Sequence, residues 1–326
     1  MFKNINIEYK DINDKEVIMY ILLKNKIEKK YKISIGYDTN ELLSLKINFN
    51  SSNILNTFGN INNKFKITKN NKKISNIYKK YLNNNEYIMN NLYFEKETNK
   101  EFEINILKTI IKYSKKKDKK ENNYYFTYST NKVVEDEKID LYNISTIGYK
   151  FIFNNIKKDK NNIIPLDGYK FLFNTEYGNK YIGSDYNFIK LSTKISFLIK
   201  LHKYNNLFIK SKYIKTFSLN KKPIPNSYLI PVGGSFSNRG INYESYFAEE
   251  LIEENIELNT RINKDIFISN FFDYSLINKK TTISSIGIGV RYITKIGTFK
   301  LDFAQNLDNK KNIKKIKINF GYGYDF

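Results

Sequence analysis

The sequence predicts an all-β chain that closes into one antiparallel transmembrane β-barrel of about 16 strands. Three observations predict this fold. First, apolar and polar residues alternate with a period of two over segments of about 8–13 residues, the length of a tilted membrane strand. Second, the chain contains 27 Tyr and 24 Phe but no Trp, and these rings gather at segment ends, where aromatic belts meet the membrane surface. Third, no apolar run approaches the ~20 residues that a transmembrane helix needs.

Residues 1–28 differ from the rest of the chain. Two short strands are expected at Asn4–Lys10 and Glu16–Leu23, joined by the turn-prone segment Asp11–Asp14. Two strands alone are marginally stable, so we expect residues 1–28 to be the end of another domain and residues 29–326 to form the barrel. The first residues lack the basic and apolar regions of a signal peptide. Either the protein is cytosolic, or this chain is part of a longer one.

The barrel strands follow from the alternation, taken in chain order. The first is Tyr31–Tyr37. The last is the clearest: from Ile316 to Phe326 six apolar residues alternate with polar residues or glycine, and the sequence ends on an aromatic ring. Between residues 60 and 140 the alternation leaves the number of strands open. The other clear segments are 43–49, 149–153, 169–173, 189–201, 256–262, 266–274, 286–292 and 299–303.

The chain is strongly basic, with 55 Lys and Arg against 33 Asp and Glu and a net charge of +22. A basic chain with interleaved aromatic residues invites comparison with nucleic-acid-binding proteins. The lysines are scattered over solvated positions, however, and no helix-turn-helix, zinc-finger or RNP motif is visible. We therefore expect no nucleic-acid partner, and a soluble basic binding protein stays a distant alternative.

Residue types that support catalysis or metal binding are scarce. Cysteine is absent and His202 is the single histidine, which excludes disulfides, thiolate zinc sites and multi-histidine metal sites. The segment Gly234–Asn238 contains serine but lacks the final glycine of a nucleophile elbow. We expect no enzyme activity, no metal and no cofactor.

Two further segments are expected to be structural. The acidic run Glu249–Glu254 fits an exposed turn that leads into a strand at Asn255–Ile262. Gly287 and Gly289 lie inside an alternating strand, where glycine on the polar face allows close approach of a neighbour or a kink.

A glycine-bracketed loop carries the most specific signal. The segment Pro231–Ile241 places Arg239 between long strands, and Asp273 lies on the polar face of a strand some 30 residues later. If that face lines a barrel, Asp273 points inward and can bind the Arg239 guanidinium in a fork geometry. The alternative is an ordinary surface loop with a solvated arginine.

From Gly233 to Phe326 the sequence resembles the C-terminal half of the barrel in the BamA/TamA superfamily. That family combines a GG…(V/I)RG(F/Y) lid loop, an inward F-x-D-x-G strand, a G-x-G strand and a closing strand that ends in Phe. The matching segments are Gly233–Gly234, Asn238–Ile241, Phe271–Ser275, Gly287–Arg291, Ile296–Ala304 and Phe320–Phe326.

The resemblance covers nearly the whole chain, strongly over the last third and weakly between residues 60 and 140. Residues 31–53 and 165–191 are similar to the opening and middle strands of the family barrel, and residues 4–28 resemble the last strands of a POTRA domain. Three residues depart from the family pattern. Asn238 and Ile241 stand where the family prefers an aliphatic and an aromatic residue, and Ser275 replaces a glycine.

The resemblance implies an outer-membrane protein of a Gram-negative-type envelope that inserts or translocates client proteins. Its implied partners are outer-membrane lipids, client proteins and periplasmic accessory proteins. A dedicated secretion pore, of the two-partner or patatin-type autotransporter kind, and a passive porin are the alternatives. The implied site residues are Gly233, Gly234, Arg239 and Gly240 of the lid, Asp273 and Phe271 as its lumen partners, and Gly321, Gly323 and Phe326 on the closing strand at the seam.

Overall fold

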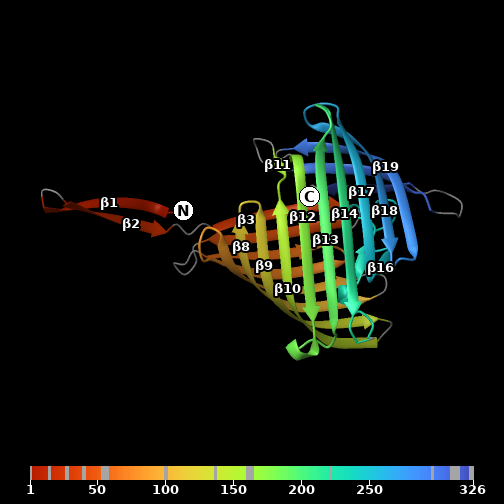
Figure 1. The fold of residues 1–326 in the computed structure, drawn as a ribbon, viewed down its shortest axis with the longest axis horizontal. Helices are drawn as coiled ribbons and strands as arrows, with labels where there is room; N and C mark the ends of the chain where they lie inside the picture. The colour runs from red at the N-terminus through yellow and green to blue at the C-terminus, as the bar shows by residue number, and fades with distance from the viewer. Residues whose placement is uncertain are drawn as a thin grey trace.

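The fold is a closed antiparallel β-barrel with a separate N-terminal hairpin (Figure 1). The computed structural model describes residues 2–13, 16–25, 29–38, 42–52, 59–98, 102–135, 138–158, 165–220, 222–294, 297–308 and 316–322. Within these residues, sixteen long strands and the two-residue β11 form the barrel, and β21 lies next to β3 to complete the ring. The predicted fold class and strand number are confirmed.

The strands follow one another around the barrel in chain order. The first half contains β3 Lys29–Asp38, β4 Leu42–Ser52, β5 Gly59–Ile67, β6 Asn71–Tyr81, β7 Glu86–Thr98, β8 Glu103–Lys117, β9 Lys120–Glu135 and β10 Lys138–Asn154. The second half contains β11 Lys157–Lys158, β12 Pro165–Gly178, β13 Phe188–Lys200, β14 Asn205–Ser218, β17 Glu250–Arg261, β18 Ile266–Ile277, β19 Thr281–Thr294, β20 Gly297–Asn306 and β21 Lys317–Tyr322. The stretch from 60 to 140 that the sequence left open thus contains β5 to β9 and the start of β10.

The alternation produces a barrel that is apolar outside and polar inside. On β18, Phe272 is exposed on the outer wall, whereas Phe271, Asp273 and Ser275 are buried inside. The same division holds around the ring: Ile, Leu, Tyr and Phe dominate the exposed strand positions, and many of the most buried side chains are Ser, Thr, Asn, Asp and Glu. A soluble β-sandwich buries its apolar faces together, so this inversion is that of a barrel surrounded by lipid.

Several strands are longer than expected. β8, β9 and β10 have 15, 16 and 17 residues, against the 8–13 predicted. Their ends carry Lys and polar residues that continue the hydrogen-bond ladder past the apolar wall, so hydropathy alone underestimates their length. No helix among the described residues is long and apolar enough to cross a membrane.

The N-terminal residues form a two-stranded sheet of their own. β1 Phe2–Asn13 pairs antiparallel with β2 Glu16–Asn25, and Figure 1 shows this hairpin to one side of the barrel. The two strands occupy the predicted segments and extend them by a few residues. That they belong to a POTRA domain stays a prediction.

An even number of strands brings both ends of the barrel to one rim. We call this end the terminal rim; its turns include residues 82–85, 118–119, 201–204 and 262–265. The opposite end is the loop rim, where the long connection 219–249 joins β14 to β17. This connection contains the 3-10 turn η3 Asn226–Tyr228 and the short paired strands β15 Ile230–Val232 and β16 Tyr246–Ala248.

The expected exposed turn at the acidic run is wrong. Glu250 begins β17, and Glu253 is fully buried in the lumen. Its carboxylate lies 2.7 Å from Lys212 Nζ, and Glu250 lies 3.0 Å from Lys215 Nζ, both on the neighbouring strand β14. Carboxylates can be buried here because a lysine on the adjacent strand compensates the charge of each one. The prediction of a solvated turn did not take these partners into account.

Candidate functional site

The candidate site is the lid, defined as residues 230–248, which folds from the loop rim into the barrel. Gly233 and Gly234 both have positive φ, 112° and 89°, a conformation that favours glycine. A Cβ on Gly233 would overlap the main-chain oxygen of Asn242. The two glycines therefore make the turn that sends the lid tip into the lumen.

The base of the lid is held by apolar packing. Ile230, Val232 and Ala248 of the lid are buried against residues from three barrel strands, namely Leu251, Ile277 and Ile283. Such a cluster stabilises the lid by removing apolar surface from water, and it fixes the direction from which the tip enters.

Arg239 at the lid tip binds Asp273 of β18 in a two-pronged ion pair. Arg239 Nε donates to Asp273 Oδ2 at 2.8 Å, and Nη2 donates to Oδ1 at 2.7 Å. The main-chain N–H of Arg239 also donates to Oδ2, at 3.0 Å. Asp273 is fully buried and Arg239 is 5% exposed, so the pair is shielded from water and salt.

The pair belongs to a larger network across four strands. Arg239 Nη1 donates to Glu257 of β17 at 2.7 Å and lies 3.5 Å from Asp302 of β20. Arg291 of β19 binds the same two carboxylates, with Nη2 2.9 Å from Glu257 Oε2 and Nη1 hydrogen-bonded to Asp302 Oδ1. Two guanidinium groups thus bridge three carboxylates, and Arg239 contributes the charge that comes from the lid.

The network keeps Arg239 charged although it is buried. Burial by itself lowers the pKa of a guanidinium, but the carboxylate of Asp273, followed by Glu257 and Asp302, outweighs this and holds the pKa of Arg239 well above its usual value. The lid tip therefore carries a permanent positive charge, and withdrawing it would leave three buried carboxylates with Arg291 as their one remaining arginine.

Glycines make room for the network. The Arg239 guanidinium carbon lies 3.4 Å from the centre of the Phe271 ring, a cation–π contact, and a Cβ on Gly287 would overlap that ring. A Cβ on Gly289 would overlap the Asp302 carboxylate. Both glycines thus allow the close approach expected of them.

Asn238 forms a second polar anchor beside Arg239. Its side chain is fully buried; Nδ2 donates to Ser275 Oγ at 3.3 Å and to the main-chain oxygen of Ile283 at 3.0 Å. Its Oδ1 accepts a hydrogen bond from Ser285 Oγ. Asn238 and Ser275 are two of the three departures from the family pattern, and the structure places them in contact with each other.

The lid also touches the closing strand β21. Asn319 Nδ2 donates to the main-chain oxygen of Arg239 at 2.8 Å. A Cβ on Gly321 would lie 3.9 Å from the Phe236 ring and 4.0 Å from Ser235 Cβ, so the lid tip covers this glycine without a clash. The lid therefore reaches the seam, which we define as the contact between β21 and β3.

The structure brings together most of the residues that the sequence singled out. Arg239, Asp273 and Phe271 meet in the lumen, and Gly321 lies beside the lid. Gly323 and Phe326 lie outside the described residues. Sequence reasoning missed Glu257, Arg291, Asp302 and Asn319. The signal that could have found them is a charged or amide side chain at the inward position of an alternating strand.

The lid site consists of ion pairs and hydrogen bonds between the lid tip and the barrel strands. Among the described residues, no group of three or more His, Cys, Asp and Glu side chains could hold a metal ion. The site provides a long loop that is fixed by charge at its tip and lies next to the closing strand β21.

Comparison with known proteins places the fold. The structure is similar to BamA from Haemophilus ducreyi lacking POTRA domains 1–3, with a TM-score of 0.85 and 14% identity over 98% of this chain and 74% of that one. It is also similar to CdiB from Escherichia coli, with a TM-score of 0.63, 9% identity and coverage of 98% and 67%. CdiB from Acinetobacter baumannii is similar with a TM-score of 0.59 and 9% identity, over 98% of this chain and 65% of that one. This chain therefore spans less than two thirds of that protein.

No curated protein sequence matches the chain. At the identities above, the structural likenesses show the fold alone. The sequence itself, however, matches the Omp85 superfamily domain over residues 28–326, which covers the whole barrel, the lid and the seam. The chain belongs to the Omp85 superfamily and is a β-barrel of the Gram-negative outer membrane.

Proposed function

We propose that this barrel inserts or translocates client polypeptides, and that the seam between β21 and β3 is where a client strand is received. Membership of the Omp85 superfamily supports a role in handling client proteins. The observation that carries the proposal is the contact of Asn319 with Arg239, which connects the locked lid to the closing strand.

The chemistry of the seam suits a client strand. β21 lies between β20 and β3, and its described residues, Lys317–Tyr322, pair with β20. If the contact with β3 opens, the freed edge of β21 can be extended by a new strand, because main-chain N–H and C=O groups pair with any extended chain. No nucleotide is needed for such pairing, and periplasmic accessory proteins would bring the client to the terminal rim.

A disulfide across the seam tests this proposal. The chain contains no cysteine, so Gly321→Cys can be paired in turn with Lys32→Cys or Ser34→Cys on β3. These positions alternate with Tyr31 and Ile33, which are exposed on the outer wall, and therefore lie on the lumen side. Insertion of an outer-membrane client into liposomes should be lost in the oxidised protein and return on reduction.

A matched control places the disulfide between strands that need not part. Phe303 and Ile318 are register partners on β20 and β21, and the oxidised Phe303→Cys/Ile318→Cys protein should keep its activity. If sealing the seam leaves insertion intact in both seam pairs, the lateral mechanism is wrong.

The likeness to CdiB supports a second candidate, a dedicated pore for one secreted protein. Such a pore passes its client through the lumen, so it needs the lid to leave and has no need of the seam. Secretion that continues with the seam oxidised, but stops when the lid is tethered to the wall, would favour this candidate. Large conductance with an untethered native lid would instead indicate a passive porin.

The proposal includes a division of the chain. Residues 1–28 would be the end of a POTRA-like periplasmic domain and residues 29–326 the barrel. The family match that starts at residue 28 supports this boundary, as does the pairing of β1 with β2 alone.

A further inference from the structure

The outer wall at β8 and β9 carries an ordered ladder of cross-strand pairs. Starting at the terminal rim, the register partners are Lys117 with Lys120, Lys115 with Asn122, Tyr113 with Tyr124, and Ile111 with Phe126. From the terminal rim toward the middle of the barrel, these four pairs thus pass from charged side chains to tyrosines and then to apolar side chains. This is the order in which a membrane passes from headgroup to interface to acyl chains.

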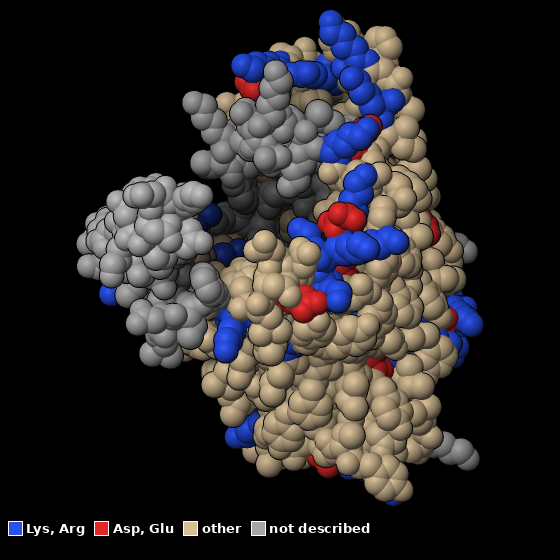
Figure 2. Space-filling view, turned by 60° about the vertical axis from the view of Figure 1, so that its left-hand side comes forward, with Lys and Arg blue, Asp and Glu red and all other residues tan. Residues whose placement is uncertain are grey.

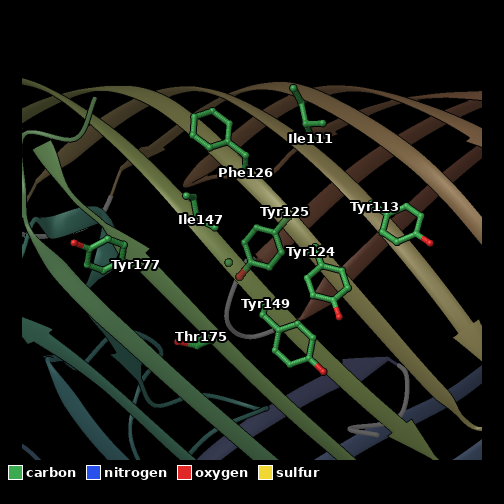
Figure 3. A pocket seen from close by; sticks show the side chains of 10 residues that line it. Ile111, Tyr113, Tyr124, Tyr125, Phe126, Ile147, Tyr149, Thr175 and Tyr177 are labelled. Carbon is green, nitrogen blue, oxygen red and sulfur yellow. The ribbon is translucent and has the colours of Figure 1, made fainter. Parts of the chain in front are cut away.

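A groove of about 520 Å³ lies in the outer wall at the aromatic level of this ladder. Figure 3 shows its lining: Ile111, Tyr113, Tyr124, Phe126, Ile147, Tyr149, Thr175 and Tyr177, with Tyr125 and Gly148. The Tyr124 ring lies 6.4 Å from Tyr113 and 5.2 Å from Tyr149, so three rings from β8, β9 and β10 form a continuous row.

The floor of the groove is low for local reasons. Tyr125 and its register partner Gly148 both face the lumen, so they contribute only backbone to the outer wall. The Tyr125 hydroxyl donates there to Asn174 at 2.7 Å and to Glu176 at 3.1 Å. Thr175, the register partner of Tyr149, is small. Large rings around a floor of backbone and one small side chain leave a recess with an almost entirely apolar lining.

Two lysines above the groove, Lys117 and Lys120, have no ion-pair partner among the residues that the structure describes. Lys117 and Lys120 face each other across the β8–β9 ladder, and both are exposed. Like charges directly opposite on a sheet repel. Of the lysines from 115 to 120, only Lys115 has an ion-pair partner among the described residues, Glu86 at 2.9 Å. An anion between Lys117 and Lys120 would relieve the repulsion.

The orientation of the barrel decides which leaflet supplies that anion. Outer-membrane barrels have short periplasmic turns and longer extracellular loops. The β8–β9 turn is residues 118–119 at the terminal rim, whereas the long connection 219–249 is at the loop rim. The terminal rim is therefore periplasmic. Seen from the side of the N-terminal hairpin, Lys and Arg gather in a band beside a wall of uncharged side chains (Figure 2).

We propose that this surface binds one anionic phospholipid of the periplasmic leaflet, with its phosphate between Lys117 and Lys120 and an acyl chain in the groove. Charge complementarity selects the headgroup, and the apolar lining selects the chain. A free phosphate would satisfy only the lysines, and a zwitterionic lipid would gain little from them. The site is remote from the lid network in sequence and in strand order, so it stands independently of the proposed function.

The absence of Trp from the chain makes the test direct. Tyr149→Trp places a single fluorophore in the groove, and Tyr31→Trp, exposed on β3, places one on the outer wall away from it. Each protein is reconstituted in phosphatidylcholine containing equal mole fractions of brominated phosphatidylglycerol or brominated phosphatidylcholine. Quenching by bromine reports which lipid is in contact with the fluorophore.

We expect phosphatidylglycerol to be preferred at position 149 by roughly fivefold for each lysine engaged, and not at position 31. High salt should reduce the preference. Lys117→Ser/Lys120→Ser should abolish it. Lys69→Ser/Lys72→Ser, which removes the same charge from exposed positions at the loop rim, should leave it unchanged.

Two results would overturn the proposal. One is equal quenching by the two lipids at position 149 in the protein with all its lysines. The other is a preference that survives Lys117→Ser/Lys120→Ser, which would mean that the net charge of the barrel, and not this pair, attracts the lipid. Migration of each variant as a compact band before heating shows that the barrel is folded.

Discussion

Asn319 on the closing strand donates a hydrogen bond of 2.8 Å to the main-chain oxygen of Arg239, the residue that fixes the lid tip in the lumen. Through Arg239 the closing strand is connected to Asp273, Glu257 and Asp302 on three other strands. The lid thus holds the closing strand from inside the lumen. A client strand that pairs with β21 would act on the lid as well, because Asn319 of β21 is hydrogen-bonded to Arg239 of the lid.

Removing the charge of the lid tip should weaken the barrel strongly. Arg239→Ala leaves Asp273, Glu257 and Asp302 with Arg291 as their remaining arginine, and breaking a buried pair on one side costs about 3–5 kcal/mol. We expect a lower temperature for loss of the compact band in gel electrophoresis, together with loss of client insertion. Asp273→Ala should have a similar effect.

Two substitutions calibrate that result. Arg239→Lys keeps the charge but loses the two-pronged geometry, so its stability should be intermediate. Arg261→Ala removes a half-buried arginine outside the network, whose guanidinium donates to main-chain oxygens of residues 263 and 264 and lies 5.8 Å from the centre of the Phe267 ring, and its effect should be much smaller than that of Arg239→Ala. Unchanged stability in both Arg239→Ala and Asp273→Ala would show that the ion pair does not hold the lid.

The sequence predicted the strands and one ion pair because both depend on local pattern. Alternation determines which face of a strand meets lipid, and it places Asp273 inward; the flanking glycines mark the loop that carries Arg239. Glu257, Arg291 and Asp302 could not be joined to this pair in the same way. Their meeting depends on the register between four strands, which pairs Glu257 with Phe271 and Asp302 with Gly289.

The acidic run shows a different failure. Glu253, Asn255 and Glu257 share one parity on β17, and all three are buried in the lumen. Alternation therefore contained the information that Glu253 faces inward. A cluster of carboxylates predicts a solvent-exposed segment when no compensating charge is visible nearby in the sequence. The compensating lysines, Lys212 and Lys215, lie some 40 residues away, and their strand pairing is not known from the sequence.

Asn238 and Ser275 should be energetically coupled. Asn238→Val leaves Ser275, Ser285 and the Ile283 carbonyl without their partner in the lumen, and an unsatisfied buried polar group costs about 1–3 kcal/mol. Ser275→Gly in the same protein removes one of these groups. The double variant should therefore be more stable than the sum of the single effects predicts.

The measurement is a double-mutant cycle on the unfolding free energy in urea. Thr282→Val, at an exposed position on β19 near the loop rim, serves as a control that should add independently to Asn238→Val. Strict additivity of Asn238→Val and Ser275→Gly would mean that the contact between them contributes nothing.

Gly240 should tolerate a side chain only if space is made for it. A Cβ there would overlap the Ser285 side chain, so Gly240→Ala should lift the lid tip and destabilise the barrel by about 1–3 kcal/mol. Ser285→Gly in the same protein removes the overlapping atoms and should restore part of the loss. If Gly240→Ala is neutral, or if Ser285→Gly makes it worse, the tip is not packed as the structure has it.

Cutting the connection between lid and seam should separate stability from activity. Asn319→Ala removes the hydrogen bond to the Arg239 main chain but leaves the ion-pair network of Arg239 intact. A single hydrogen bond contributes about 0.5–1.5 kcal/mol, so the barrel should lose little heat resistance, far less than in Arg239→Ala.

Because the closing strand of Asn319→Ala is no longer tied to the lid, the seam should open more often and client insertion should become faster. Two measurements, the insertion rate and the unfolding free energy, distinguish an effect on the seam from a general loss of stability. Asn319→Ala should raise the insertion rate at a nearly constant unfolding free energy. A loss of both would show that Asn319 supports the fold and has no part in gating the seam.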